Sequence, residues 1–179
     1  MATVHTVGHG ARPIEEFLGL LRSASVDVLA DVRRFPGSRR HPRFGREPLA
    51  AALAAAGIRY EWHGGALGGR RSRRPGSRHT ALRNAGFAGY ADQMDSREFR
   101  HAVLDLRRRA EAGERIAVMC AETLWWRCHR CFIADALVLL DTEVVHLVAP
   151  GQSQRHRPHA TLRGGEDGWP VYDVPDTLL

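Results

Sequence analysis

Short apolar segments alternate with longer segments of helical periodicity along most of this 179-residue chain, and that alternation limits the possible folds most strongly. Five apolar, β-branched segments are expected to form strands: residues 3–7, 26–32, 58–62, 115–119 and 143–148. Helical spacing predicts helices over residues 13–21, 48–56 and 128–140, and another between a capping box at residues 95–98 and Gly113. The sequence therefore predicts an α/β fold: a single three-layer domain with a mainly parallel five-stranded sheet and helices on both faces, a Rossmann-like arrangement.

The chain shows no internal repeat and no linker, so one domain is expected over residues 1–150. Residues 151–179 are polar and rich in Gly, Pro and His, and we expect them to form a tail or flap of the same domain. Residues 64–89 are rich in Gly and Arg and lack periodicity. A loop of that length inside a compact domain is usually functional or mobile.

Composition excludes several classes of protein. Hydrophobic residues make up 44% of the chain and charged residues 26%, which excludes disorder as the main state. No apolar run approaches the roughly 20 residues that a membrane helix needs, and the first residues do not resemble a secretory signal. The three cysteines all lie within residues 120–131, which argues against a disulfide framework. We expect a cytoplasmic protein in a reducing compartment with no membrane partner.

Reactive or polar residues follow three of the predicted strands. His9 follows the first strand, Asp31 and Arg33 end the second, and Cys120 and Glu122 end the fourth. Because the carboxyl ends of parallel strands meet at one edge of a sheet, these five side chains are expected to converge there. Ligands of open α/β sheets bind at that edge, so the sequence predicts the functional site there.

The segment 120–131 holds all three cysteines and leads into a predicted helix. A helix N-terminus stabilises anions, so Cys120 or Cys128 is a candidate thiolate nucleophile, with Arg127 and Arg130 adding positive charge. His129 is its candidate partner. The same helix start is suited to cradle a phosphate, whereas the alternative is that the thiols are small buried apolar groups.

A metal site is a second interpretation of the same residues. Cys128 and Cys131 have Cys-x-x-Cys spacing, and Cys120 with His9 or His129 would complete a set of ligands for zinc or iron. The Cys-x-x-Cys pair is also compatible with a redox function, although that spacing alone is weak evidence. We commit to no cofactor on this basis.

Arginines dominate two predicted loops. All 26 basic residues are arginine, and the formal net charge is +6. Neither loop contains an acidic residue between its arginines, and both are expected to leave the sheet at the edge that carries the cysteines. Basic loops with nearby aromatic residues are typical of sites that bind single-stranded nucleic acid or exposed bases. The arginines are Arg33, Arg34, Arg39, Arg40, Arg43 and Arg46 in one loop and Arg70, Arg71, Arg73, Arg74, Arg78 and Arg83 in the other.

Several ordered motifs together resemble the domain of unknown function 488 (DUF488) family. They are Thr6-Val7-Gly8-His9, Asp31-Val32-Arg33, Leu67-Gly68-Gly69-Arg70, Arg83-Asn84 with Tyr90, and Met119-Cys120-Ala121-Glu122 with Cys128-His129-Arg130. The resemblance implies an α/β fold with a site at these motifs and implies no particular reaction. Gly10 and Cys131 depart from the family pattern, and the second departure weakens a metal site built on Cys131.

Two other resemblances are looser. A strand ending in Asp-Val-Arg and a later strand-cysteine-loop-helix unit resemble rhodaneses and cysteine phosphatases, whose loop amides hold an anion beside a cysteine. Cys128-His129-Arg130 is similar to the Cys-His-Arg of alkylguanine DNA methyltransferases, although Arg127 stands where that family has proline.

Together these features predict a cysteine-containing enzyme that acts on nucleic acid or a nucleotide, with repair or modification of a base as the preferred reaction. The expected catalytic residues are Cys120 as preferred nucleophile, Glu122 as acid or base, Cys128 and His129. A non-catalytic nucleic-acid-binding module, a zinc or iron thiolate protein, and a rhodanese-like or phosphatase-like anion site are the alternatives. The expected substrate- and phosphate-binding residues are His9, Asp31, Arg33, Arg39, Arg40, Arg70, Arg83, Asn84, Tyr90, Arg127 and Arg130.

Overall fold

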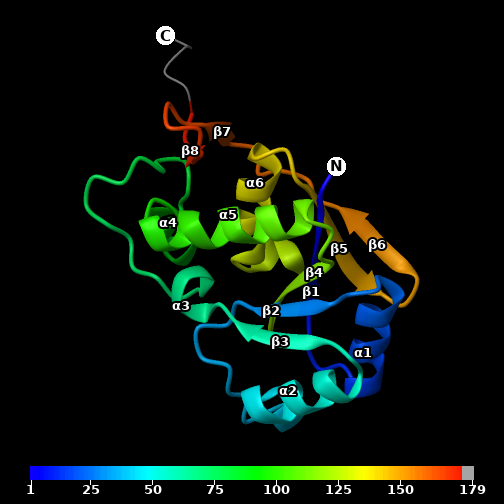
Figure 1. Ribbon diagram of the computed structural model, residues 1–179. Helices are drawn as coiled ribbons and strands as arrows, with labels where there is room; N and C mark the ends of the chain where they lie inside the picture. The colour runs from blue at the N-terminus through cyan, green and yellow to red at the C-terminus, as the bar shows by residue number, and fades with distance from the viewer. Residues whose placement is uncertain (175–179) are drawn as a thin grey trace.

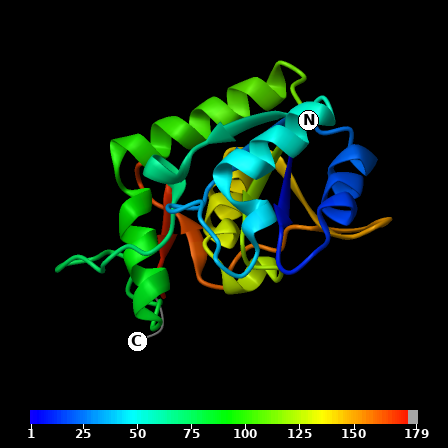
Figure 2. The ribbon, with the colours of Figure 1, turned by 90° about the horizontal axis from the view of Figure 1, so that it is seen from below.

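A six-stranded mixed sheet forms the centre of the molecule, and helices cover both of its faces (Figures 1 and 2). The computed structural model describes residues 1–174. Its strands are β1 (Thr3–Gly8), β2 (Val28–Asp31), β3 (Arg59–Trp62), β4 (Ile116–Cys120), β5 (Glu143–Ala149), β6 (Gln152–Arg155), β7 (Leu162–Gly164) and β8 (Pro170–Tyr172). Its α-helices are α1 (Ile14–Ser23), α2 (Arg46–Ala55), α3 (Gly64–Leu67), α4 (Ala85–Met94), α5 (Arg97–Glu111) and α6 (Arg130–Leu139). The predicted three-layer α/β fold is confirmed.

The strand order in the main sheet is β3-β2-β4-β1-β5-β6. The first five strands along the chain run parallel, and β6 pairs antiparallel with β5 at the edge. The prediction of five strands was therefore wrong by one. All four residues of β6 are polar and exposed, so the segment has no apolar alternation that would reveal a strand. Gly151, with φ +71°, makes the turn that joins β5 to β6.

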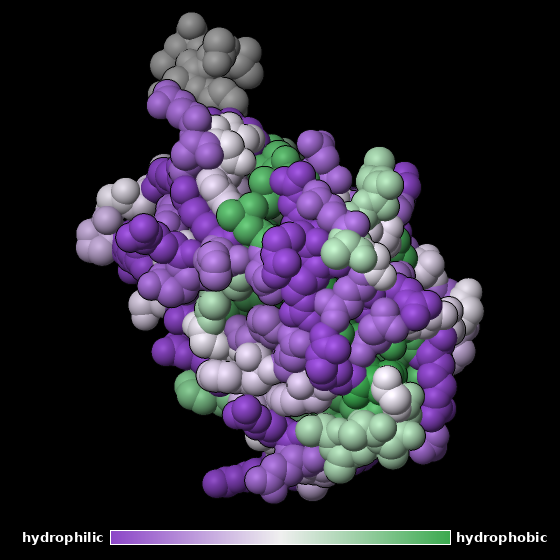
Figure 3. All heavy atoms as spheres, in the orientation of Figure 1, coloured by the Kyte–Doolittle hydropathy of each residue, from purple (hydrophilic) through white to green (hydrophobic). Residues whose placement is uncertain are grey.

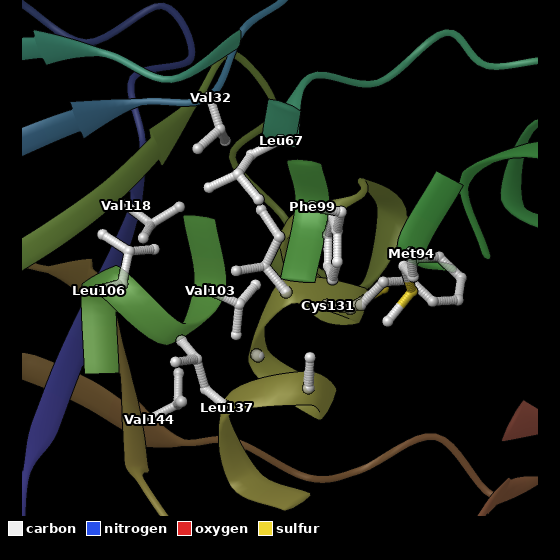
Figure 4. Packing of buried hydrophobic residues seen from close by; sticks show 14 of the residues in the cluster. Val32, Leu67, Met94, Phe99, Val103, Leu106, Val118, Cys131, Leu137 and Val144 are labelled. Carbon is white, nitrogen blue, oxygen red and sulfur yellow. The ribbon is translucent and has the colours of Figure 1, made fainter. Parts of the chain in front are cut away.

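Side chains alternate between two apolar cores along β4, as expected for a strand that is buried on both faces. Val118 belongs to the core beneath α4, α5 and α6, whereas Met119 belongs to the core beneath α1 and α2. Figure 4 shows part of the first core, where Val118 lies with Val103 and Leu106 of α5. Cys120 has the same parity as Val118, so it faces the side of the sheet on which α6 begins.

The predicted loop over residues 64–89 is partly wrong, because it contains α3 and the start of α4. Two glycines in the first turns of α4, Gly86 and Gly89, hide its apolar periodicity. The helix is nevertheless specified locally, because the Asn84 side chain accepts a hydrogen bond of 3.0 Å from the Phe87 backbone N–H. The exposed middle of the segment between α3 and α4, residues 73–76, extends away from the body of the molecule (Figures 1 and 2), whereas His79 and Leu82 are buried.

The segment predicted as a polar tail contains ordered structure within its described part. It forms β6 and the β7–β8 hairpin, which is a separate two-stranded sheet. Tyr172 of β8 is fully buried, and its hydroxyl donates a hydrogen bond of 2.8 Å to Asp135 of α6. Residues 175–179 of the predicted tail lie outside the described residues.

The N-terminus of α5 is capped by Ser96, whose hydroxyl accepts a hydrogen bond of 3.2 Å from Phe99 N–H. The predicted capping box is therefore displaced by one residue, since Asp95 instead pairs with Arg78 and Arg100.

The face of the molecule in Figure 3 is largely hydrophilic. Among residues 1–174, no helix combines the length and apolar character that crossing a membrane requires.

Candidate functional site

The strand order places β4 between β1 and β2, so that the carboxyl ends of these three strands are neighbours. Gly8 of β1 pairs with Cys120 in register, and Asp31 of β2 pairs with Met119. A side chain at Gly8 is excluded, because its Cβ would lie 2.0 Å from the carbonyl oxygen of Glu122. The structure thus brings the predicted strand-end residues to one edge of the sheet, with the loop after β4 packed against β1.

A cavity of about 690 Å³ opens at this edge. Nine of the residues predicted to form the site line it, together with residues that the sequence analysis did not select. The predicted lining residues are His9, Arg33, Arg39, Arg40, Arg70, Cys120, Glu122, Cys128 and His129. The further lining residues include Gly10, Arg34, Ser38, His41, Gly69 and Thr123.

Two thiols lie in contact at the base of this cavity. The Sγ atoms of Cys120 and Cys128 are 3.0 Å apart, close enough for the S–H of one to donate to the sulfur of the other. Cys128 retains 9% exposure and Cys120 only 2%, so Cys128 is the more accessible thiol. Burial and the neighbouring sulfur raise the pKa of Cys120 well above its ordinary value.

Cys128 is the thiol that ionises. Burial opposes its ionisation, but the S–H of Cys120 and the charge of Arg130 lower its pKa to about 5. Cys128 Sγ also accepts hydrogen bonds of 3.4 Å from the backbone N–H of Arg130, the first residue of α6, and of 3.2 Å from its side-chain Nε. The prediction of Cys120 as the preferred nucleophile stays a prediction, but α6 and its arginine act on the other sulfur.

The guanidinium of Arg130 is 1% exposed and forms no ion pair with a carboxylate of residues 1–174. Its remaining donors are satisfied by the carbonyl oxygens of Glu122 and Thr123 and by the hydroxyl of Thr6, 3.3 Å away. A buried cation needs a compensating anion, and the Cys128 thiolate is the group in position to supply it. The buried arginine and the thiolate therefore stabilise each other.

A buried hydrogen-bond chain continues from Thr6 to the opposite side of α6. The Thr6 hydroxyl lies 2.6 Å from His146 Nδ1, His146 Nε2 lies 2.9 Å from His156 Nδ1, and His156 Nε2 lies 2.8 Å from Asp135 Oδ1. Burial, together with the charges of His156 and Arg130, lowers the pKa of His146 to about 3. The Thr6 hydroxyl that accepts from Arg130 Nη1 is itself held by this chain to Asp135, so the chain holds Arg130 in one orientation.

Two other imidazoles face the cavity in neutral form. Burial lowers the pKa of His9 to about 4, and it also lowers the pKa of His129. His129 Nε2 donates to the Val32 carbonyl oxygen at 3.0 Å, so its Nδ1 carries no proton and is available as an acceptor. A Cβ at Gly69 would lie 3.0 Å from that nitrogen, so glycine allows the backbone to approach the ring closely.

Arg33 and Asp31 form a buried bidentate ion pair. Nε and Nη2 of Arg33 donate to the two carboxylate oxygens at 2.9 and 2.6 Å, and Tyr60 Oη donates to the same carboxylate at 2.7 Å. Arg33 Nη1 also lies 3.3 Å from His9 Nε2. The Arg33 charge is thus compensated within the protein, and its predicted role in phosphate binding becomes one of holding His9 in place.

Most arginines of the two basic loops form no ion pair with a carboxylate of residues 1–174, unlike most arginines elsewhere in the chain. Of these twelve arginines, only Arg33 and Arg78 pair with a carboxylate among residues 1–174. Arg34, Arg39, Arg40 and Arg70 line the cavity without an anionic partner from that part of the chain. A second cavity of about 260 Å³ shares Arg34 and Arg70 with the first, and Arg71 and Arg74 complete its positive lining. The edge of the sheet therefore offers uncompensated positive charge along two hollows that share Arg34 and Arg70.

Six predicted site residues do not line the cavity: Asp31, Arg83, Asn84, Tyr90, Arg127 and Arg130. Arg83 and Arg127 are exposed outside it. Asn84 caps α4, so its predicted contact with substrate is replaced by a structural one. Tyr90 is 1% exposed, donates to the Leu67 carbonyl oxygen at 2.8 Å and packs on the His129 ring, so it positions that imidazole.

Cys131 does not join the other two thiols. It lies in the apolar core with Met94 and Phe99 (Figure 4), and burial raises its pKa. Among residues 1–174, the three side chains whose donor atoms gather closely enough to hold a metal are His79, Asp92 and Asp95, away from the cavity. Asp95 of that cluster is already paired with Arg78 and Arg100. The predicted set of Cys120, Cys128, Cys131 and His9 is not assembled.

Sequence reasoning missed the residues that hold Arg130. These residues lie in strands, in α6 and in the predicted tail, where a purely structural role was the natural expectation. They are Thr6, His146, His156 and Asp135. The one indication in the sequence was that polar residues interrupt segments predicted to be buried. Only the strand order brings those residues together. His41 and Thr123 were missed because their segments have no regular pattern, whereas Arg34 was named only as a member of the first basic loop.

The family model described as "Domain of unknown function DUF488" matches residues 13–137 of the 179-residue chain. The match covers β2, β3 and β4 with Cys120 and Cys128, and it confirms the family resemblance; the motif at residues 6–9 lies before the matched residues. Neither the curated proteins nor the solved structures contain a significant match. The family description names no reaction, so the function is argued from the site.

Proposed function

The chain belongs to the DUF488 family, and from its site we propose a cysteine-dependent enzyme that acts on a nucleotide or on nucleic acid. The observation on which the proposal depends most is the environment of Cys128. Its sulfur contacts Cys120 at 3.0 Å and the buried guanidinium of Arg130 at 3.2 Å, at the base of a cavity lined with unpaired arginines. A lowered thiol pKa in a cleft is typical of a nucleophile.

The positive charge of the cavity supports an anionic substrate. Planar guanidinium groups bind phosphate through forked hydrogen bonds, and four unpaired arginines face the main cavity. The second hollow, with Arg71 and Arg74, would accommodate a neighbouring phosphate of a longer chain. Two basic hollows that share Arg34 and Arg70 suit nucleic acid or a nucleotide with several phosphates better than a substrate with one charge.

The proposed step is attack by Cys128 Sγ on an electrophilic atom of the bound nucleotide. A bond forms between sulfur and that atom, and the leaving group departs with the electron pair of the broken bond. Modification or repair of a base is a reaction of this kind. Glu122 lies at the cavity wall with Oε1 accepting from Leu124 N–H at 3.1 Å, and it is the proposed acid that protonates the leaving group.

Binding of labelled single-stranded DNA, RNA, duplex DNA and nucleoside triphosphates, followed by fluorescence anisotropy at several salt concentrations, tests the substrate class. We expect affinity to fall steeply with salt, and Arg39→Ala and Arg40→Ala each to reduce the salt slope by about 0.7–0.9. Arg107→Ala is the matched control, because Arg107 pairs with Glu111 on α5. Absence of binding to every ligand at low salt would refute the proposal.

The same arginines would serve a non-catalytic nucleic-acid-binding module, and Cys128→Ser separates the two functions. For an enzyme, this substitution abolishes the covalent adduct or product that mass spectrometry detects after incubation with the bound nucleotide, and it preserves binding. Binding by both proteins with no chemical change of any bound nucleotide would favour the binding module.

A further inference from the structure

The second thiol of the site is not explained by a single nucleophile. Cys120 is 2% exposed, and its S–H lies 3.0 Å from Cys128 Sγ and 3.6 Å from the Glu122 carbonyl oxygen. A substrate entering the cavity therefore meets Cys128 before Cys120. Once a group is attached to Cys128, Cys120 is the nucleophile already in contact with the sulfur that carries it.

We propose that Cys120 and Cys128 form a redox-active pair that exchanges electrons with anionic thiols and disulfides, with Cys128 as the attacking and Cys120 as the resolving cysteine. This inference rests on the thiolate of the proposed function and does not depend on nucleic acid as the substrate. The proposed exchange gives both cysteines a role in the reaction. Irreversible transfer of an alkyl group to one cysteine would give Cys120 none.

In the direction of disulfide reduction the exchange balances in two steps, and the same steps in reverse oxidise a substrate dithiol. The Cys128 thiolate attacks one sulfur of a disulfide RS–SR′, an S–S bond forms, and R′S⁻ leaves with the electron pair of the broken bond. Cys120 then loses its proton to the released thiolate and attacks Cys128 Sγ, which expels RS⁻ and closes the Cys120–Cys128 disulfide. The substrate gains two electrons and the protein loses two; a thiol reductant restores the dithiol.

The geometry of the pair favours ring closure. The two sulfurs must approach by about 1 Å to reach the bond length of a disulfide. Cys120 is held at the end of β4 by its register with Gly8, whereas Cys128 lies in the loop before α6 and is the partner that moves. The eight-residue separation closes a small loop, so little chain entropy opposes the bond.

The buried arginine determines the direction in which the pair reacts most readily. Oxidation converts the Cys128 thiolate into a neutral sulfur and leaves Arg130, which is 1% exposed, without its anion. The reduced form is therefore stabilised relative to the disulfide, as in disulfide oxidants whose thiolate form is stabilised, so the favoured direction is oxidation of a substrate dithiol by the Cys120–Cys128 disulfide. The Cys120–Cys128 disulfide should be reduced more easily than an unstrained structural disulfide.

The unpaired arginines of the cavity define the substrate class. Arg39, Arg40 and Arg70 line the path to Cys128 and offer no acidic partner of their own among residues 1–174. A disulfide with carboxylate or phosphate groups gains ion pairs on entry, whereas a cationic disulfide is repelled. We therefore expect the ratio of the rate with 5,5′-dithiobis(2-nitrobenzoate), which carries two carboxylates, to the rate with cystamine at low salt to fall at least tenfold when Arg39→Ala and Arg40→Ala are combined.

Reaction of the folded protein with one equivalent of 5,5′-dithiobis(2-nitrobenzoate) at pH 6.5 tests the resolving role. The wild type should release two equivalents of thionitrobenzoate, retain no adduct and lose two hydrogens in intact mass. Cys120→Ser should stop at one equivalent with a stable mixed disulfide on Cys128. Cys120→Ala should give the same adduct, and Cys131→Ala, the matched control, should behave as wild type.

The outcomes separate this inference from the proposed function. A wild-type protein that keeps a stable adduct on Cys128, like Cys120→Ser, would overturn the resolving role and leave the nucleophile intact. A Cys128 that does not react at pH 6.5 in any variant would refute the thiolate and, with it, both proposals. Circular dichroism of each variant before reaction establishes that the comparison concerns folded protein.

Discussion

Replacing Cys128 by serine should destabilise the protein by an amount that depends on pH. The substitution leaves the buried guanidinium of Arg130 beside a neutral hydroxyl, and removing one partner of a buried ion pair costs about 3–5 kcal/mol. A pKa of about 5 in the folded state lies below the unfolded value of about 8.5, so wild-type stability rises with pH across this interval. The thiolate therefore contributes several kcal/mol more at pH 8 than at pH 5.

Urea denaturation of wild type and Cys128→Ser at pH 5 and pH 8 measures this difference. Other titrating groups are common to both proteins, so they cancel in the comparison, and packing changes at the serine contribute equally at both pH values. We expect the stability gap to widen by several kcal/mol at pH 8. Cys131→Ala, which removes a neutral buried thiol, should show a nearly constant gap. An equal gap at both pH values for Cys128→Ser would refute the ionised thiol.

Three other substitutions test the supporting contacts. Thr6→Val removes the hydroxyl that accepts from the buried guanidinium, and it should raise the Cys128 pKa by up to about one unit; an unchanged alkylation profile contradicts this. Asp31→Asn should lower the free energy of unfolding by about 3 kcal/mol or more in urea, and a loss below about 1 kcal/mol would show that this ion pair is not buried. Gly8→Ala would place a Cβ 2.0 Å from a carbonyl oxygen and should lower the melting temperature. Its control, Gly19→Ala, lies in open space on α1 and should raise the melting temperature. Equal effects of the two substitutions would contradict the close packing at Gly8.

The position of the site could be predicted from the sequence because strand ends are locally marked. Gly8 and Cys120 terminate apolar segments, and parallel pairing fixes which end of each strand they occupy. The alternation of apolar segments was sufficient for the layers and for the parallel strands. It was not sufficient for β6, whose exposed residues have no periodicity, or for α4, whose glycines interrupt it.

The choice between the two thiols could not be made from the sequence. It depends on which sulfur the Arg130 side chain reaches, and α6 places Nε of that arginine 3.2 Å from Cys128. The chain from Thr6 through His146 to Asp135 depends on β1 lying next to β5, a neighbour relation that no local pattern encodes. Long-range polar contacts of this kind are set by strand order, so the sequence showed only their separate members.

Iodoacetamide alkylation of the wild-type protein between pH 4 and pH 9, with peptide mapping of the modified cysteine, tests the central claim most directly. The structure predicts that Cys128 is modified first and that its rate rises with a midpoint near pH 5. Cys120 and Cys131 should stay unmodified until the protein unfolds. Modification of Cys120 before Cys128, or a midpoint near the ordinary thiol value of about 8.5, would contradict a thiolate held by Arg130.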